Sequence, residues 1–308
     1  MLITKYKKIT ALFALISLAY VLLVALLPQD KATLSKYHIS GGQLVGLDIA
    51  ILAPYIVIWL FALVGYLRLK AYAESIRGGK DGEAFRLIAL GLFWLSFWLP
   101  ISAVISSATS GYYRAHTSST PEMINLNNYV NILLLLAAFI FVYEGSKKLL
   151  SIVKRTEVPL PHFVMILFIS FSSVYTFLVI HDPARQFPTQ SVHVASYYLP
   201  DWLIILSIVI PRLITWYLGV KAIHNIYMYR KKTKAPIYKH ALSRLAFGLG
   251  WVIATIIVLR LFESLTSQLN RMSLQAILLI IYVLLAIMCV GYVLIAKGAR
   301  SLQRIEEI

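Results

Sequence analysis

The chain has 308 residues, of which 59% are hydrophobic and only 14% are charged, and its formal net charge is +16. Soluble domains are about half apolar and about one quarter charged, so this composition excludes a water-soluble globule. Nucleic-acid binding is excluded as the reason for the positive charge, because the basic residues lie in short clusters between apolar segments. The composition indicates an all-α integral membrane protein.

Eight apolar segments reach the roughly 20 residues that a helix needs to cross a bilayer. Unpaired backbone groups are costly in hydrocarbon, so we expect these segments to be helices. The first follows Lys5, Lys7 and Lys8 and is too long for a typical signal sequence, so we expect it to be retained. In chain order, the predicted spans are 9–28, 47–69, 85–107, 129–150, 162–181, 202–223, 241–263 and 274–296.

The lysines and arginines between the spans predict the orientation of the chain. Most of the 29 fall in the first and last segments and in the loops after the second, fourth and sixth spans, which share one side. By the positive-inside rule, that side and both termini are cytoplasmic. Together with the compact loops, this predicts a multi-pass protein of a prokaryotic cytoplasmic (inner) membrane, whose basic loops face anionic lipids. The other side receives only Lys31, Lys36, Arg114, Arg185 and Arg271.

The two halves of the chain resemble each other. Shifts of 155 and 153 residues align the first span with the fifth and the fourth with the eighth, as in Gly145/Gly298. Because each unit holds four spans, both units insert in the same orientation. The sequence thus predicts a tandem 4+4 parallel repeat with a pseudo-two-fold axis along the membrane normal, in which residues 1–155 and 162–308 are joined by a Pro-containing linker at 156–161. A shift of 157 residues pairs Pro54/Pro211, Trp59/Trp216, Tyr72/Tyr229, Gly91/Gly248 and Trp94/Trp251 without a gap.

Two arginines lie inside apolar segments and mark a candidate ligand site. Arg212 is near the middle of the sixth span, where a charge costs at least roughly 2.5 to 3.5 kcal/mol. Arg260 lies one turn from Glu263 on the seventh span, so the two share a helix face. The functional interpretation is a polar site in the outer half of the second repeat, with Asp201 and Trp202 at its rim. The structural interpretation is an internal network, in which Glu263 neutralises Arg260 and Arg212 binds carbonyls and tyrosine hydroxyls.

The repeat bears on this choice. Arg212, Arg260 and Glu263 correspond to neutral residues of the first half, namely Tyr55, Ala103 and Ser106. The first half is expected to fold in the same way without the charges, so a scaffold alone does not require them. This comparison favours a function confined to the second half.

Three functional classes remain in view. The leading one is a non-enzymatic membrane protein that binds, translocates or senses a small solute, with an anion as the candidate ligand. The second is a membrane scaffold that docks a protein partner or anionic lipid on its basic cytoplasmic face. The third is a membrane enzyme acting on lipid or haem. The docking residues of the second class would be Arg230, Lys231, Lys232 and Lys234.

No cofactor or metal is expected. None of the seven histidines lies in the middle of a span, whereas a haem with two histidine ligands needs two imidazoles at similar depth in the bundle. The single cysteine, Cys289, excludes a disulfide framework and a thiolate cluster. The glycines of the 77–82 turn lack the strand and helix that a phosphate loop requires, so this turn is interpreted as a connector.

Overall fold

The computed structural model describes residues 6–26, 41–76, 79–115, 121–153, 158–180, 205–268 and 274–306, and the elements in these ranges are all helices. The prediction of an all-helical fold is therefore confirmed. The α-helices are α2 (Lys7–Leu26), α4 (Gly41–Ser75), α5 (Lys80–Ala115), α6 (Pro121–Ile152), α7 (His162–Ile180), α10 (Ile210–Lys232), α11 (Pro236–Gln268) and α12 (Leu274–Glu306), and a short π-helix, η1 (Ile205–Val209), precedes α10.

Most helices extend past the spans that hydropathy predicts. Helix α5 has 36 residues and α12 has 33, whereas the predicted spans cover only residues 85–107 of α5 and the first part of α12, up to residue 296. The last turns of α12 carry Lys297, Arg300, Arg304 and Glu306, and lysine, arginine and glutamate are good helix formers in water. Apolar length therefore reports the part of a helix suited to hydrocarbon and not where the helix ends.

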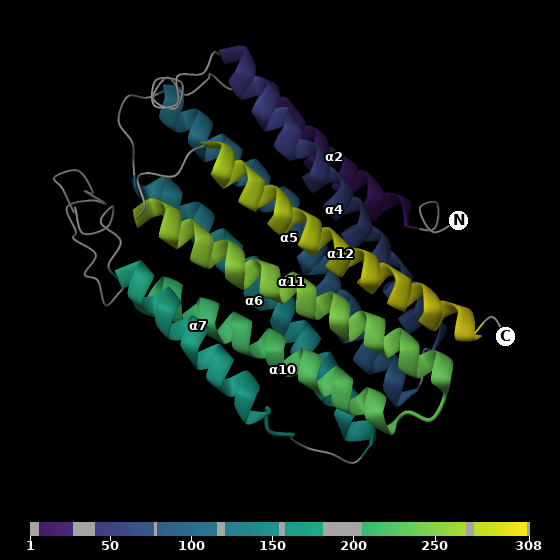
Figure 1. The fold of residues 1–308 in the computed structure, drawn as a ribbon. Helices are drawn as coiled ribbons and strands as arrows, with labels where there is room; N and C mark the ends of the chain where they lie inside the picture. The colour runs from purple at the N-terminus through teal and green to yellow at the C-terminus, as the bar shows by residue number, and fades with distance from the viewer. Residues whose placement is uncertain are drawn as a thin grey trace.

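The helices form one elongated bundle in which successive helices run in alternating directions (Figure 1). The two chain ends lie at the same end of the bundle, which also holds the connections between α4 and α5 and between α10 and α11. We call this the terminal end. The arrangement agrees with an even number of helices between the two termini.

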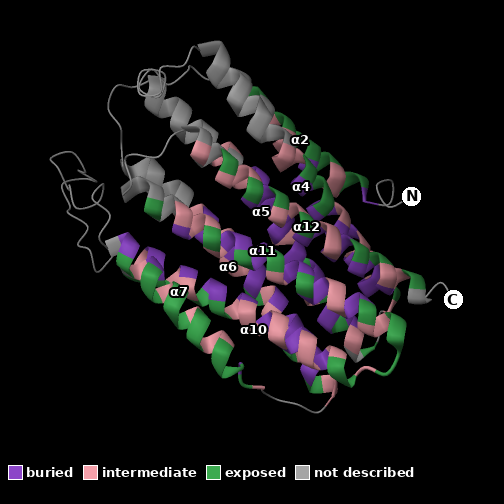
Figure 2. Ribbon diagram, viewed as in Figure 1, coloured by how far each residue is buried: buried purple, intermediate pink, exposed green. Residues whose placement is uncertain are grey.

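Within the described residues, seven helices are long and apolar enough to cross a membrane. They contain Pro54–Ser75, Asp81–Ser102, Tyr129–Ile152, His162–Val179, Leu206–Lys232, Pro236–Phe262 and Leu279–Arg304. The first predicted span, 9–28, is the one missing from this set; it forms helix α2, several of whose side chains lie outside the described residues. Buried residues line the interior of the bundle, and exposed residues cover the outer faces of the helices (Figure 2). Large apolar side chains such as Leu15, Phe163 and Leu279 are among the exposed ones, which suits a surface in contact with lipid.

The contacts between helices follow the same order in both halves of the chain. Helix α2 packs on α4 and α5, and α7 packs on η1 and α11. The pairs α4 with α5 and α5 with α6 are matched by α10 with α11 and α11 with α12. The halves meet through α4 with α12 and through α10 with α6, so exchanging the halves leaves this set of contacts unchanged.

Close approaches of glycine repeat at the matching positions. A Cβ atom on Gly91 would lie 2.6 Å from the Ala138 carbonyl oxygen, and one on Gly248 would lie 2.6 Å from the Gly291 carbonyl oxygen. A shift of 157 residues relates Gly91 to Gly248, and a shift of 153 residues relates Ala138 to Gly291. Small residues let membrane helices approach backbone to backbone, and here they join α5 to α6 and α11 to α12.

The two aligned prolines have different local structures. Helix α4 continues through Pro54, whereas Pro211 is the second residue of α10, just after the π-helical turn η1. Proline lacks the N–H that would bond the carbonyl four residues earlier, and its ring clashes with that carbonyl, so a widened turn at this point has an identifiable cause. The same turn contacts α6, because the Ser207 and Tyr129 hydroxyls are 2.9 Å apart.

Candidate functional site

Arg212, the predicted centre of the outer site, is buried on α10 and only 8% exposed. Its Nη1 donates a hydrogen bond to the hydroxyl of Tyr175 on α7, and its Cζ lies 5.9 Å from the centroid of that ring. The Tyr175 ring packs in turn against Trp216, with centroids 4.9 Å apart. Arg212 is therefore held at the interface between α7 and α10.

This interface has its own apolar cluster, which is separate from the main core. Outside the cluster, α7 exposes large apolar side chains such as Phe163, Ile166 and Phe177. Helix α7 thus buries mainly its last turns. The hydrogen bond from Arg212 to Tyr175 crosses this small apolar interface. We call the buried residues of this contact the α7 cluster: Tyr175, Leu178, Val179, Val209, Trp216 and Leu261.

The other residues of the predicted outer site are described only in part. Arg260 is half buried on α11 and directly precedes Leu261, a member of the α7 cluster. The side chain of Glu263, and the whole of Asp201 and Trp202, lie outside the described residues. The structure therefore brings the α11 segment of Arg260 to the helices around Arg212, and the acidic part of the site stays a prediction.

The predicted docking residues lie at the terminal end of the bundle. Arg230 and Lys231 lie over the ring of Tyr227, 5.4 and 4.9 Å from its centroid. Lys231, Lys232 and Lys234 are exposed, and Arg230 is half buried. Cations in the last turn also stabilise a helix through its dipole, so part of this charge has a structural role in α10.

Polar contacts join the two halves inside the bundle. Asn225 Nδ2 on α10 donates to Ser146 Oγ on α6 over 3.2 Å, and both residues are buried. Arg68 Nη1 on α4 donates to the Ala296 carbonyl on α12, also over 3.2 Å. Asn225 and Arg68 are 157 residues apart, so equivalent positions supply the donor on both sides of the interface.

Aromatic rings fill the terminal end of the interface between the halves. Phe85 lies 5.1 Å from Tyr72 and 6.3 Å from Tyr238 between ring centroids, and Tyr238 lies 6.4 Å from Tyr229. The Tyr229 hydroxyl is 3.5 Å from both carboxylate oxygens of Asp81. These contacts connect α4, α5, α10 and α11, and a solute moving between the halves would have to displace them.

A charged cleft of about 620 Å³ opens between α4 and α5 at the terminal end. Its α4 wall carries Lys70 and Glu74, and its α5 wall carries Glu83 and Arg86. The Lys70 ammonium lies 4.9 Å from the centroid of the Tyr6 ring, and the Tyr6 hydroxyl donates to Glu74 over 2.8 Å. The remaining lining residues are Tyr66, Ala73, Gly79, Gly82, Ala89 and Leu90.

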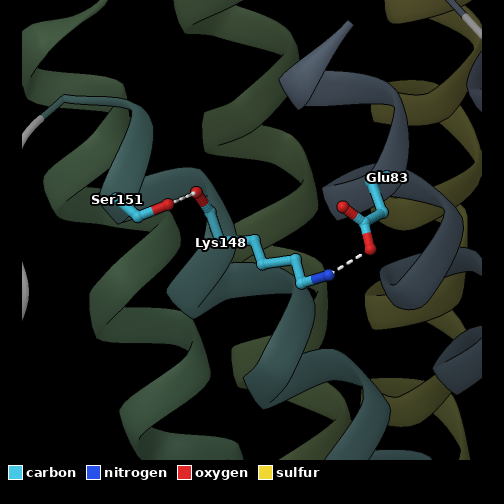
Figure 3. Close-up of polar contacts among 3 residues, drawn as sticks. All are labelled: Glu83, Lys148 and Ser151. Carbon is cyan, nitrogen blue, oxygen red and sulfur yellow. Dashed lines mark hydrogen bonds and ion pairs between the residues drawn. The ribbon is translucent and has the colours of Figure 1, made fainter. Parts of the chain in front are cut away.

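One rim of this cleft is held by an ion pair between Glu83 and Lys148 of α6 (Figure 3). Both side chains are largely exposed, and the Ser151 hydroxyl donates to the Lys148 carbonyl one turn further along α6. Gly82 allows the tight turn that brings the walls together, because a Cβ on this residue would lie 2.4 Å from the Ile76 carbonyl oxygen. Gly79 and Gly82, from the turn interpreted as a connector, therefore line the charged cleft.

Sequence reasoning missed this cleft because its charges sit near the ends of two helices. Such charges are normally solvated, and a single sequence does not reveal which of them meet. The available signal was the spacing of Lys70 with Glu74 and of Glu83 with Arg86, which places opposite charges on one face of each helix.

The seven long apolar helices and their lipid-suited outer faces define a multi-pass helical membrane protein. Among the described residues, no three His, Cys, Asp or Glu side chains are grouped so as to hold a metal ion. No protein family matches this chain, and no characterised protein or solved structure is similar to it at a significant level.

Proposed function

We infer that this protein is a prokaryotic inner-membrane protein of eight spans, built from two four-helix repeats with both termini in the cytoplasm. The repeat is supported by the matched helix contacts, by the paired glycine approaches and by the burial of both Trp59 and Trp216. Residues 156–161 remain the proposed linker between the repeats. The orientation rests on the basic residues, which gather on the side of the termini.

The proposed activity is to bind a small anionic solute in the outer half of the second repeat, in order to translocate or to sense it. The observation that carries the proposal is the burial of Arg212 within a membrane-spanning helix. Arginine is suited to recognising carboxylates and phosphates, because its guanidinium presents paired donors. Arg260 and Glu263 would line the same site, with Asp201 and Trp202 at its entrance.

The comparison between the halves supports this proposal. Tyr55 stands at the position equivalent to Arg212, and it lies beside Trp59 with ring centroids 6.1 Å apart. The position equivalent to Arg212 in the first half is thus occupied by an uncharged residue. A buried cation carries an insertion cost that this neutral arrangement avoids, which favours a functional reason for retaining it.

The test compares Arg212→Gln with the wild type in a thermal-shift panel of sodium chloride, acetate, phosphate and sulfate at constant ionic strength. At least one anion is expected to raise the midpoint of the wild type. The variant should fold with a similar midpoint in the absence of that anion and lose most of the shift. Lys232→Gln, a neutral change at the terminal end, is the control and should keep the full shift.

A structural role for Arg212 is the competing proposal, and its hydrogen bond to Tyr175 favours it. In that case Arg212→Gln lowers the midpoint equally in every salt, and Tyr175→Phe has the same effect. That pattern would contradict anion binding. It would also show that the guanidinium serves to hold α7 on the bundle.

The second candidate function is docking through Arg230, Lys231, Lys232 and Lys234. The exposure of the three lysines favours it. Replacing all four by glutamine should then abolish the effect of anionic vesicles on the thermal midpoint, while leaving the anion panel unchanged. An unaltered response to vesicles would exclude this surface as the docking site.

A further inference from the structure

The charges of the α4–α5 cleft are arranged in layers along the bundle axis. Helix α4 runs toward the terminal end and α5 runs away from it (Figure 1). Lys70 is therefore deeper than Glu74 on one wall, and Arg86 is deeper than Glu83 on the other. The two cations lie at the inner level and the two carboxylates at the outer level.

The spacing of these levels follows from helix geometry. At 1.5 Å per residue, Lys70 and Glu74 are separated by about 6 Å along the axis, and Glu83 and Arg86 by about 4.5 Å. Below the cations, the cleft is lined by apolar atoms of Tyr66, the buried Ala89 and the partly exposed Leu90. From the inside outward, the order is therefore apolar surface, positive charge, negative charge and water.

This order is complementary to one class of ligand. An ethanolamine phospholipid has acyl chains, then a phosphate and then, after a short linker, an ammonium group that faces water. Its phosphate would meet Lys70 and Arg86, and its ammonium would meet the two glutamates. The match depends only on depth in the membrane, so it holds for either leaflet.

The individual side chains are suited to these roles. Among the described residues, Arg86 has no ion-pair or hydrogen-bond partner, and its guanidinium can bind two phosphate oxygens at once. Glu74 accepts a bond from Tyr6, and an ionised carboxylate has about four acceptor sites, so it can bind an ammonium group in addition to other donors. The cleft volume of about 620 Å³ falls in the ordinary range for small-ligand pockets.

The second half provides an internal comparison. The positions equivalent to Lys70, Glu74, Glu83 and Arg86 hold Tyr227, Lys231, His240 and Ser243. Neither carboxylate is kept there, and Lys231 introduces a positive charge at the outer level. An ammonium group would be repelled at that place, so the zwitterion-compatible layering belongs to the first half alone.

We propose that the cleft between α4 and α5 binds a zwitterion carrying a phosphate and a primary ammonium group, in the form of an ethanolamine phospholipid headgroup. Lys70 and Arg86 hold the phosphate, and Glu74 and Glu83 hold the ammonium. This site is independent of the proposed anion site at Arg212. It involves different helices, a different half of the chain and a ligand without net charge.

The experiment measures binding of phosphatidylethanolamine to the purified full chain in detergent, by native mass spectrometry at increasing lipid concentration. Phosphatidylcholine, which has no ammonium N–H, and phosphatidylglycerol, which has no amine, are the comparison lipids. We expect phosphatidylethanolamine to bind at least roughly tenfold more tightly than either, since charge-assisted hydrogen bonds are lost with both. Equal affinity for the three lipids would overturn the proposal.

Substitutions test which charge layer binds the phosphate and which binds the ammonium group. Arg86→Gln should weaken phosphatidylethanolamine binding roughly tenfold. The double variant Glu74→Gln/Glu83→Gln should remove the preference over phosphatidylglycerol, because no carboxylate then repels an anionic headgroup. Lys147→Gln, exposed at the same end but outside the cleft, should leave lipid binding unchanged. An Arg86→Gln variant that keeps wild-type affinity would contradict the assignment.

A competition experiment with a water-soluble headgroup distinguishes binding of the lipid from binding of a free small ligand. Glycerophosphoethanolamine carries the same phosphodiester and ammonium groups without acyl chains. We expect it to compete only weakly, because it lacks the apolar part that would lie along Tyr66 and Leu90. Competition as strong as that of the intact lipid would overturn the lipid assignment.

Discussion

Gly145 of α6 lies directly against Ala84 of α5, so that a Cβ atom on the glycine would stand 2.7 Å from the alanine carbonyl oxygen. The same relationship recurs between Gly298 and Ala241, at 2.9 Å. Gly145→Val and Gly298→Val should each force the paired helices apart. Overpacking of this kind costs about 1 to 3 kcal/mol, which should appear as a lower thermal midpoint in detergent.

Gly250 is the matched control for these substitutions. It lies inside α11 with no atom within 4 Å of an added Cβ. Gly250→Ala should be neutral or stabilise the fold by up to about 1 kcal/mol, because alanine is the better helix former. A loss as large as that of Gly145→Val would show that the effect comes from glycine in general and not from the close approach.

Asn131 on α6 is expected to be coupled to Trp98 on α5. The Trp98 Nε1 donates to Asn131 Oδ1 over 2.7 Å, and both residues are buried. Asn131→Leu leaves the indole N–H unsatisfied, which should cost about 1 to 3 kcal/mol. A double-mutant cycle with Trp98→Phe measures the coupling, and a value near zero would contradict the bond.

Tyr175→Phe isolates the hydroxyl that binds Arg212. The ring and its packing on Trp216 are kept, and the hydrogen bond to a charged donor is lost. The structural role of Arg212 predicts a loss of about 1.5 to 3 kcal/mol and earlier release of α7 from the bundle, whereas the anion-binding proposal predicts a stability close to that of the wild type. Hydrogen exchange measures this release by comparing the protection of the α7 amides with that of the α6 amides. If the α7 amides are as well protected in Tyr175→Phe as in the wild type, the hydrogen bond does not hold α7 on the bundle.

Lys148→Gln removes the ion pair at the rim of the cleft. Because both partners are largely exposed, the pair should contribute less than about 1 kcal/mol to stability. The substitution also leaves Glu83 available to a ligand, so phosphatidylethanolamine should bind more tightly than to the wild type. Weaker binding would indicate that Lys148 itself contacts the headgroup.

The orientation is tested with reporter fusions. Fusions after Val153 and after Lys232 should both report the cytoplasm, and a fusion after Arg114 should report the outside. An external reading after Val153 would contradict the even number of spans in the first half. It would also exclude parallel insertion of the two repeats.

The sequence by itself determined the class of fold, and it predicted a pairing of the two halves. Apolar runs of membrane length are expected to form helices, because in hydrocarbon the backbone groups must form hydrogen bonds with one another. The pairs Gly91/Gly248 and Gly145/Gly298, matched by residue offset alone, are the positions at which α5 approaches α6 and α11 approaches α12. A position at which packing requires a small residue can be recognised in the sequence.

Only the tertiary structure decided which polar groups meet. The helical period places Arg260 and Glu263 on one face, and the structural interpretation expected tyrosine hydroxyls beside Arg212. Nothing in the sequence indicates that the partner is Tyr175 of α7. The charged cleft needs the turn at Gly82 to bring two walls together. Which polar side chains meet across two helices depends on the relative rotation and depth of the helices, which follow from packing along their whole length and leave no local pattern in the sequence.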